Sequence, residues 1–298
     1  MLEVLAAMGC SEAMTLSLVS PAELGRAGLP ADGVEVENPL RAEESMLRMQ
    51  ILPGLLGVVA HNAAHGQADV AVFEVGNVFL VPPEGQTLPD EREHAAAVLA
   101  GTVQRRPHEA DRPVDVYDAV DLVEGLGEAL ALEDLRLEPG WHTGFHPSRT
   151  AVVVVDGAAV GHVGEVAPEV LEAYGLDAPV VGLELDLGRL LAGRRRERTY
   201  RPVSRFPASG VDLAFVVDDR APAGAVRTTL EEAAGGLLES VRLFDVFRSE
   251  ALGPGRVSLA FALRFRAPDR TLTDEEVGAL RQRCIDAVVA AHGAELRG

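Results

Sequence analysis

The stretch Ser-Leu-Ala-Phe-Ala-Leu-Arg-Phe-Arg-Ala-Pro-Asp-Arg-Thr-Leu-Thr-Asp-Glu-Glu occupies residues 258–276 and predicts a strand followed by a capped helix. Residues 258–265 have the pattern of a strand. Thr273 stands three residues before Glu276, which is the spacing of a capping box, where each side chain bonds the backbone N–H of the other residue. The helix is therefore predicted over residues 273–292.

The elements around this stretch follow a known order. They are a strand at 212–217, a helix at 223–234, a strand at 238–247, the strand at 258–265, the helix at 273–292 and a final stub at 294–297. The order β-α-β-β-α-β is typical of the split βαβ, ferredoxin-like arrangement. Both helices of such a domain cover one face of a four-stranded sheet. We therefore expect the other face to be open for binding.

The first two thirds of the chain predict a different sheet. Asp156-Gly157 joins apolar runs at 151–155 and 158–163 and predicts a two-residue hairpin turn, because this pair tolerates positive φ angles. Further strands are expected at 70–75, 77–81, 95–103 and 180–185, and helices at 45–62, 116–130 and 168–174. Many strands with few helices favour an antiparallel sheet covered by helices. The fold class is therefore α+β.

The charge balance changes toward the end of the chain. Residues 200–298 carry 13 Arg against 14 Asp and Glu, whereas the whole chain carries 27 Arg, no Lys, and 46 Asp and Glu. Residues 188–202 include Gly193, the run Arg194–Arg196 and Pro202, so we place a boundary there, between domains at 1–195 and 199–298. The arginine run is either a solvated linker or an RNA contact. Only the second domain would tolerate a polyanion.

Several classes of protein are disfavoured. No apolar run reaches the length of about 18 residues that indicates a membrane span, and the N-terminus lacks the features of a signal peptide. Cys10 and Cys284 fit core positions in a reducing cytoplasm. The phosphate-binding glycine motifs, the zinc motif and the GxSxG elbow are absent, and His61 and His65 lack a third ligand. We assign no catalytic or metal-binding residue. An uncapped helix at 2–8 suggests a chain that begins inside a longer protein.

Two sets of short motifs lie in a fixed order along the chain. The second domain has Ser204-Arg205-Phe206-Pro207 and residues 212–217, 243–247, 258–261 and 266–276. The first has Asn38-Pro39-Leu40, Leu47-Arg48, Leu52–Leu56, Asn62, Phe73–Phe79, Phe145-His146-Pro147 with Arg149 and Ala151, and Gly161–Glu165 with Pro168. These motifs resemble the β subunit of bacterial phenylalanyl-tRNA synthetase over essentially the whole chain.

The resemblance implies a non-catalytic module similar to class II synthetase cores at 1–195 and a ferredoxin-fold anticodon-binding domain at 199–298. It also implies an α subunit partner in an α2β2 complex that uses ATP and magnesium to attach phenylalanine to tRNA(Phe). We expect no cofactor in this chain and no activity from it alone. A class II site needs arginines to hold the ATP phosphates, but no Arg occurs from 63 to 91 and the segment 182–189 is acidic.

The resemblance also implies individual RNA-binding residues. Phe247 matches a family aromatic on the open face where an anticodon base stacks, and otherwise it is an ordinary core aromatic. Asp245 shares its face. The full set of RNA-binding candidates is Ala214, Asp245, Phe247, Ser258, Arg205, Arg248 and Arg266. Ser209–Val211 and Val257 stand where the family commonly has basic residues, so we expect fewer phosphate contacts.

For the first domain, we expect a large subunit interface made by the helix over 45–62 and the sheet edge beside it. The candidates are Arg48, Leu52, Pro53 and Leu55. Glu74 is either a structural carboxylate or a catalytic base. An alternative function, a free-standing RNA-binding or assembly module without a synthetase role, stays open.

Overall fold

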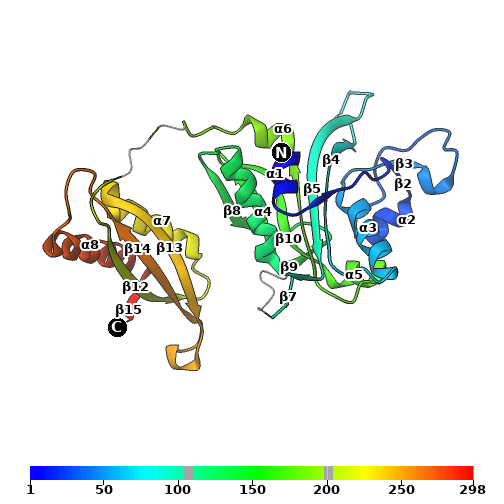
Figure 1. The fold of residues 1–298 in the computed structure, drawn as a ribbon. Helices are drawn as coiled ribbons and strands as arrows, with labels where there is room; N and C mark the ends of the chain where they lie inside the picture. Colours follow the sequence, from blue (N-terminus) through cyan, green and yellow to red (C-terminus); the bar gives the residue numbers. More distant parts are fainter. Residues whose placement is uncertain (83, 104–109, 198–199, 201–203, 298) are drawn as a thin grey trace. The chain divides into compact units, whose positions relative to one another are not determined.

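The computed structural model describes residues 1–82, 84–103, 110–197, 200 and 204–297. The chain divides into two units, Met1–Arg198 and Thr199–Gly298 (Figure 1). Arg198 and Pro202 of the expected linker lie outside the described residues. No helix in the described part of the chain has the length and apolarity needed to cross a membrane.

A seven-stranded sheet organises the first unit. Its spatial order is β1 (Ser11–Glu12), β4 (Val70–Leu80), β5 (Asp90–Ala100), β11 (Val180–Asp186), β10 (Ala158–Val166), β9 (Phe145–Val155) and β8 (Leu135–Pro139). Every neighbouring pair is antiparallel except β1 with β4. The predicted antiparallel sheet and the hairpin at Asp156-Gly157 are confirmed.

Helices cover both faces of this sheet (Figure 1). One core contains α2 (Pro21–Arg26), α3 (Leu52–Ala64) and α5 (Pro168–Tyr174), and the other contains α1 (Leu2–Ala7), α4 (Val116–Ala129) and α6 (Leu187–Ala192). Val72 lies in the first core and Phe73 in the second, because successive strand residues point to opposite faces. The short strands are β2 (Leu18–Val19), β3 (Met46–Leu47), β6 (Thr102–Val103) and β7 (Arg112–Pro113), and η1 is a 3-10 turn at Ala42–Glu44.

The helix expected from residue 45 was predicted with the wrong start. Met46 and Leu47 form β3, which pairs with β2, and α3 begins only at Leu52. Pro53 fits the first turn because its missing N–H needs no partner there. Arg48 therefore precedes the helix and does not belong to it.

The second unit has the predicted ferredoxin-like order. Its elements are β12 (Ser209–Asp218), α7 (Ala223–Ala234), β13 (Leu238–Phe247), β14 (Arg256–Phe265), α8 (Asp274–His292) and β15 (Glu295–Arg297), with 3-10 turns η2 (Gly235–Leu237) and η3 (Glu250–Leu252). The strands lie in the order β13-β14-β12-β15, and all pairs are antiparallel. One core joins both helices to one face of the sheet.

The long helix α8 has the predicted capping box. The Thr273 side chain accepts from the Glu276 N–H, and the Glu276 carboxylate accepts from the Thr273 N–H at 2.9 Å. That backbone bond lowers the pKa of the Glu276 carboxyl. At the other end Gly293 has φ +57°, which turns the chain into β15.

Candidate nucleic-acid interface

The strand register decides which residues of the second unit share its uncovered face. Leu213, Phe215 and Leu259 point into the helical core. Their neighbours therefore point the other way, and directly opposed residues of antiparallel strands share a face. We call this set the open face. The name covers the part of that face around Phe247, namely Ala214, Val216, Asp245, Phe247, Ser258, Ala260, Glu295 and Arg297.

Four candidates from the sequence meet on the open face. Phe247 lies opposite Ser258, and Asp245 lies opposite Ala260, which in turn faces Ala214. A register shift between Leu243 and Asp245 precedes this part of β13. The Phe247 ring is 40% exposed, so it is not a core aromatic. The carboxylate of Asp245 is also exposed.

The open face is less open than the sequence suggested. Arg297, on the far edge strand, places its guanidinium 4.8 Å from the centroid of the Phe247 ring. Beside it the Arg256 guanidinium donates to the Val216 carbonyl at 3.2 Å and to Glu295 at 3.1 Å. These long side chains leave Val216 and Ser258 largely buried. The side chains of Arg297 and Arg256 thus cover the centre of the sheet on this face.

The three arginine candidates lie at different ends of the sheet. Arg248 directly follows Phe247 and is exposed. Arg266 directly follows Phe265, the last residue of β14, which lies about 23 Å along the strand from Ser258. Its Nη1 donates to the Phe206 carbonyl at 2.6 Å, and its Nε lies 2.7 Å from Glu239. Arg205 adjoins Phe206 at that same end and is exposed.

Neither Val257 nor Ser209–Val211, where basic residues were expected from the resemblance, lies beside Phe247 on the open face. Val257 is buried in the helical core, so its side chain does not face the same way as Ser258. The expected loss of a phosphate contact at Val257 stays a prediction, and the core position of this side chain does not support it. Ser209 pairs with Phe265, which puts Ser209–Val211 at the end of the sheet away from Phe247.

In the first unit, Arg48 and Glu74 form a buried pair. Their side chains approach to 2.7 Å, and Arg48 is 4% and Glu74 3% exposed. Thr15 completes the cluster, since its N–H and Oγ1 donate to Glu74 at 3.0 and 2.7 Å. Each of these contacts joins Glu74 to a segment that is distant in the sequence. The geometry fits the structural role for Glu74.

Sequence reasoning missed Glu184. This carboxylate, 2% exposed on β11, accepts the N–H groups of Ile51 and Leu52 at 3.0–3.1 Å and contacts His94 Nδ1 at 2.8 Å. It therefore caps α3, whose own N-cap, Ile51, has no capping side chain. The available signal in the sequence was a carboxylate between two leucines of a mostly apolar strand.

Arg92 and Arg189, which lie near the acidic segment 182–189, form ion pairs with carboxylates of the unit. Arg92 lies 2.5 Å from Asp90 and 3.2 Å from Asp186, and Arg189 lies 3.3 Å from Asp186. The bond to Arg92 lowers the pKa of the Asp90 carboxyl. A guanidinium held by carboxylates is not positioned to hold a phosphate.

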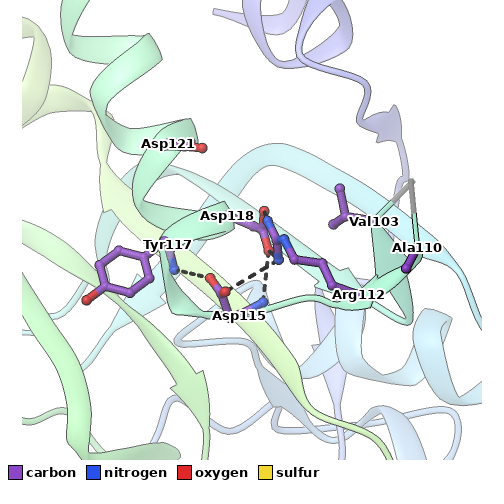
Figure 2. Close-up of a pocket in the computed structure, with 7 residues that line it drawn as sticks. All are labelled: Val103, Ala110, Arg112, Asp115, Tyr117, Asp118 and Asp121. Carbon is purple, nitrogen blue, oxygen red and sulfur yellow. Dashed lines mark hydrogen bonds and ion pairs between the residues drawn. The ribbon is translucent and has the colours of Figure 1, made fainter. Parts of the chain in front are cut away.

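A hollow of about 420 Å³ lies beside the start of α4 (Figure 2). Its lining is Val103, Ala110, Arg112, Asp115, Tyr117, Asp118 and Asp121. Arg112 makes a forked pair with Asp118 at 2.6 and 2.8 Å, and Asp118 and Asp115 form the capping box of the helix. These polar groups bond one another and fix the helix start. No group of three metal-binding side chains occurs among the described residues.

The interface candidates of the first unit are interior residues. Arg48, Leu52 and Leu55 are at most 4% exposed, and Pro53 is buried. All four side chains are enclosed within the unit, so in this arrangement they offer no surface to another chain. Cys10 and Cys284 are free and buried, and burial raises the pKa of both thiols.

Comparison with known proteins identifies the family. The family model described as "Phenylalanyl tRNA synthetase beta chain CLM domain" matches residues 1–187. The chain belongs to this family. A second model, "Ferredoxin-fold anticodon binding domain", matches residues 204–297. The resemblance inferred from the motifs is therefore confirmed.

Curated members of the β-chain family align along nearly the whole chain. Phenylalanine--tRNA ligase beta subunits are 40% identical over 98% of this chain in Symbiobacterium thermophilum, 38% over 99% in Corynebacterium efficiens and 37% over 97% in Geobacillus kaustophilus. The aligned part is 33%, 38% and 36% of those proteins, so the chain spans about a third of their length. A solved pyrrolysyl tRNA synthetase from Desulfitobacterium hafniense aligns with 64% of each chain at 18% identity and a TM-score of 0.49, too low to carry a conclusion.

Proposed function

We propose that this chain is the tRNA-binding, non-catalytic part of a phenylalanyl-tRNA synthetase β subunit. It supports the ATP-dependent attachment of phenylalanine to tRNA(Phe) by pairing with an α subunit in an α2β2 complex. ATP and magnesium bind elsewhere in that complex, and the setting is the cytoplasm. The proposal rests on family membership and on the open face of the second unit.

The observation that carries the proposal is the convergence of four candidates around one exposed ring. Phe247 offers a flat surface for an unpaired base, and stacking of a base on an aromatic ring contributes about 1–3 kcal/mol. Asp245 lies on the same face and can accept a hydrogen bond from a base edge. Ala214 and Ser258 have small side chains and lie beside these two residues on the same face.

The direct test is tRNA(Phe) binding by the Phe247→Ala variant of the full chain. We expect affinity to fall about fivefold or more with an unchanged salt dependence, because stacking releases no counterions. Val246→Ala is the matched control, since Val246 is exposed on β13 but opposes Leu259 on the other face. Unchanged affinity in Phe247→Ala, with a lowered melting temperature, would make Phe247 a structural residue and defeat the proposal.

The α subunit contact has a candidate location in the first unit. Thr15 is fixed by two hydrogen bonds of its hydroxyl group: Thr15 Oγ1 donates to Glu74 and accepts from Arg48 Nη1 at 3.0 Å. The neighbours of Thr15, Met14 and Leu16, are 94% and 72% exposed. The buried candidates thus support a loop that displays apolar side chains, which are the usual material of an obligate interface.

Co-purification with a bacterial phenylalanyl-tRNA synthetase α subunit tests this contact. We expect the chain to bind the α subunit and Met14→Asp/Leu16→Asp to lose it. Leu88→Asp, which changes a side chain 76% exposed in another loop, should keep it. Equal binding by all three would move the interface elsewhere. No binding of the unaltered chain would favour a free-standing RNA-binding module.

A further inference from the structure

Arg297 crosses the whole sheet of the second unit. It lies on β15, one edge strand, and its guanidinium covers the ring of Phe247 on β13, the other edge strand. Two strands separate these residues, so the side chain of Arg297 must lie over β12 and β14. It is the only cation whose contact with the Phe247 ring is found among the described residues.

The small side chains beneath Arg297 make this crossing possible. Arg297 lies opposite Ala214, and Ala214 lies opposite Ala260. Side chains longer than a methyl group in this row would obstruct the guanidinium. In the next row Glu295 binds Arg256, whereas no carboxylate forms an ion pair with Arg297 within the described part of the chain. Arg297 therefore faces the ring without a competing anion.

The guanidinium and the aromatic ring are both surfaces on which nucleic-acid bases stack. A base that enters between them replaces one ring–guanidinium contact by two contacts, ring–base and base–guanidinium. The cation–π contact that must open is weak at an exposed site. Insertion therefore gains more stacking than it loses.

We propose that Phe247 and Arg297 form the two walls of a slot that holds one unpaired base of the RNA, with Arg297 as a binding and positioning residue. This inference rests on the proposed function. The opposite arrangement, in which Arg297 only plugs the stacking surface, predicts the opposite sign: its removal would strengthen RNA binding.

The test uses the full chain and stem–loop RNAs with the tRNA(Phe) anticodon loop, carrying 2-aminopurine at each anticodon position in turn. The variants are Arg297→Ala and Arg297→Lys, since lysine keeps the charge but has no planar group to stack. Arg227→Ala and Arg227→Lys are matched controls, because Arg227 is exposed on α7 and pairs with Glu231. Circular dichroism melts establish that each variant is folded.

We expect Arg297→Ala and Arg297→Lys each to weaken binding by about threefold or more, from the loss of a stacked cation. Arg297→Lys should keep the salt dependence, and both variants should reduce the 2-aminopurine quenching at one position. If Arg297→Lys binds as tightly as the unaltered chain, only the charge of Arg297 contributes to binding, and the proposed slot is wrong. Equal or tighter binding by Arg297→Ala would overturn it as well.

The two levels of the hypothesis can fail separately. If the unaltered chain binds RNA and Phe247→Ala weakens it while the Arg297 variants bind normally, only the slot is wrong. If neither the unaltered chain nor any variant binds the stem–loop, the proposed anticodon-binding function fails with it.

Discussion

The guanidinium of Arg48 lies 2.7 Å from the carboxylate of Glu74, and both side chains are buried. The pair joins the segment before α3 to strand β4 and fixes Thr15 between them. Gly54 on α3 is part of the same packing, because a Cβ at this position would come within 2.5 Å of Thr15 Oγ1. The sequence left open whether Glu74 is a catalytic base or a structural carboxylate. In the structure its contacts link Thr15, Arg48 and β4 to one another.

Removing one member of this pair should be costly. We expect Arg48→Met to destabilise the first unit by about 3–5 kcal/mol, because it leaves a buried carboxylate without its counter-charge. Urea unfolding followed by fluorescence of Trp141, the single tryptophan, reports on this unit. The double variant Arg48→Met/Glu74→Leu should cost clearly less than the sum of Arg48→Met and Glu74→Leu. Additive costs would show that the two side chains do not act together.

The Glu184 cap gives a second prediction. Glu184→Ala leaves the buried N–H groups of Ile51 and Leu52 without an acceptor, and we expect a loss of about 2–4 kcal/mol. Glu184→Gln keeps one oxygen and should lose less. The control is Glu165→Gln, whose carboxylate pairs with the half-exposed Arg149 and should matter by about 1 kcal/mol or less. A Glu184→Ala variant as stable as the control would contradict the cap.

His162 predicts a pH dependence of stability. Burial, and then the charges of His142 and His94, hold the pKa of His162 well below its ordinary value. Its ring stacks on His142 at 3.7 Å, and its Nε2 has no partner in the described structure. The unfolded chain takes up a proton below about pH 6.5 that the folded chain does not, so stability is full above that pH and falls below it.

We expect His162→Phe to lose less unfolding free energy than the unaltered chain between pH 7.0 and 5.5, by up to about 1 kcal/mol. A phenylalanine ring can keep the stack on His142 and the edge-to-face contact with Phe145. His65→Gln, at the exposed end of α3, serves as control. Identical pH profiles for His162→Phe and the unaltered chain would assign the acid sensitivity to other groups.

The arginines should differ in RNA binding according to their place on the sheet. Arg248→Ala should flatten the dependence of log affinity on log salt by about 0.7–0.9, the contribution of one phosphate contact. Arg266→Ala should leave the slope unchanged but lower the melting temperature, because Arg266 holds the Phe206 carbonyl and Glu239. Arg205→Ala should also leave the slope unchanged. The reverse pattern would place the RNA at the other end of the sheet.

The isolated chain should not activate phenylalanine. Arg92 is held by Asp90 and Asp186, and Arg189 is held by Asp186, so a phosphate would have to displace these carboxylates. The measurement is ATP–pyrophosphate exchange with phenylalanine, with and without added α subunit. Exchange above background in a preparation free of α subunit would refute this expectation.

The sequence by itself determined the order and type of the elements in the second unit. The strand patterns, the Thr273–Glu276 box and the turn glycine Gly293 act within a few residues, so they can be read locally. It also determined which face Asp245 and Phe247 share, because alternation along a strand is a local property. The resemblance to the family could also be read from the sequence, because its motifs are short runs of neighbouring residues.

Only the tertiary structure decided the partners of those residues. Glu184 caps a helix 132–133 residues earlier in the chain, Arg48 pairs with Glu74 on strand β4, and Arg297 reaches Phe247 across two strands. Each contact depends on strand register and on which strands are neighbours, and both are set by the packing of whole sheets against helices. A charged residue in an apolar run shows that a partner is needed, but the fold alone determines which group supplies it.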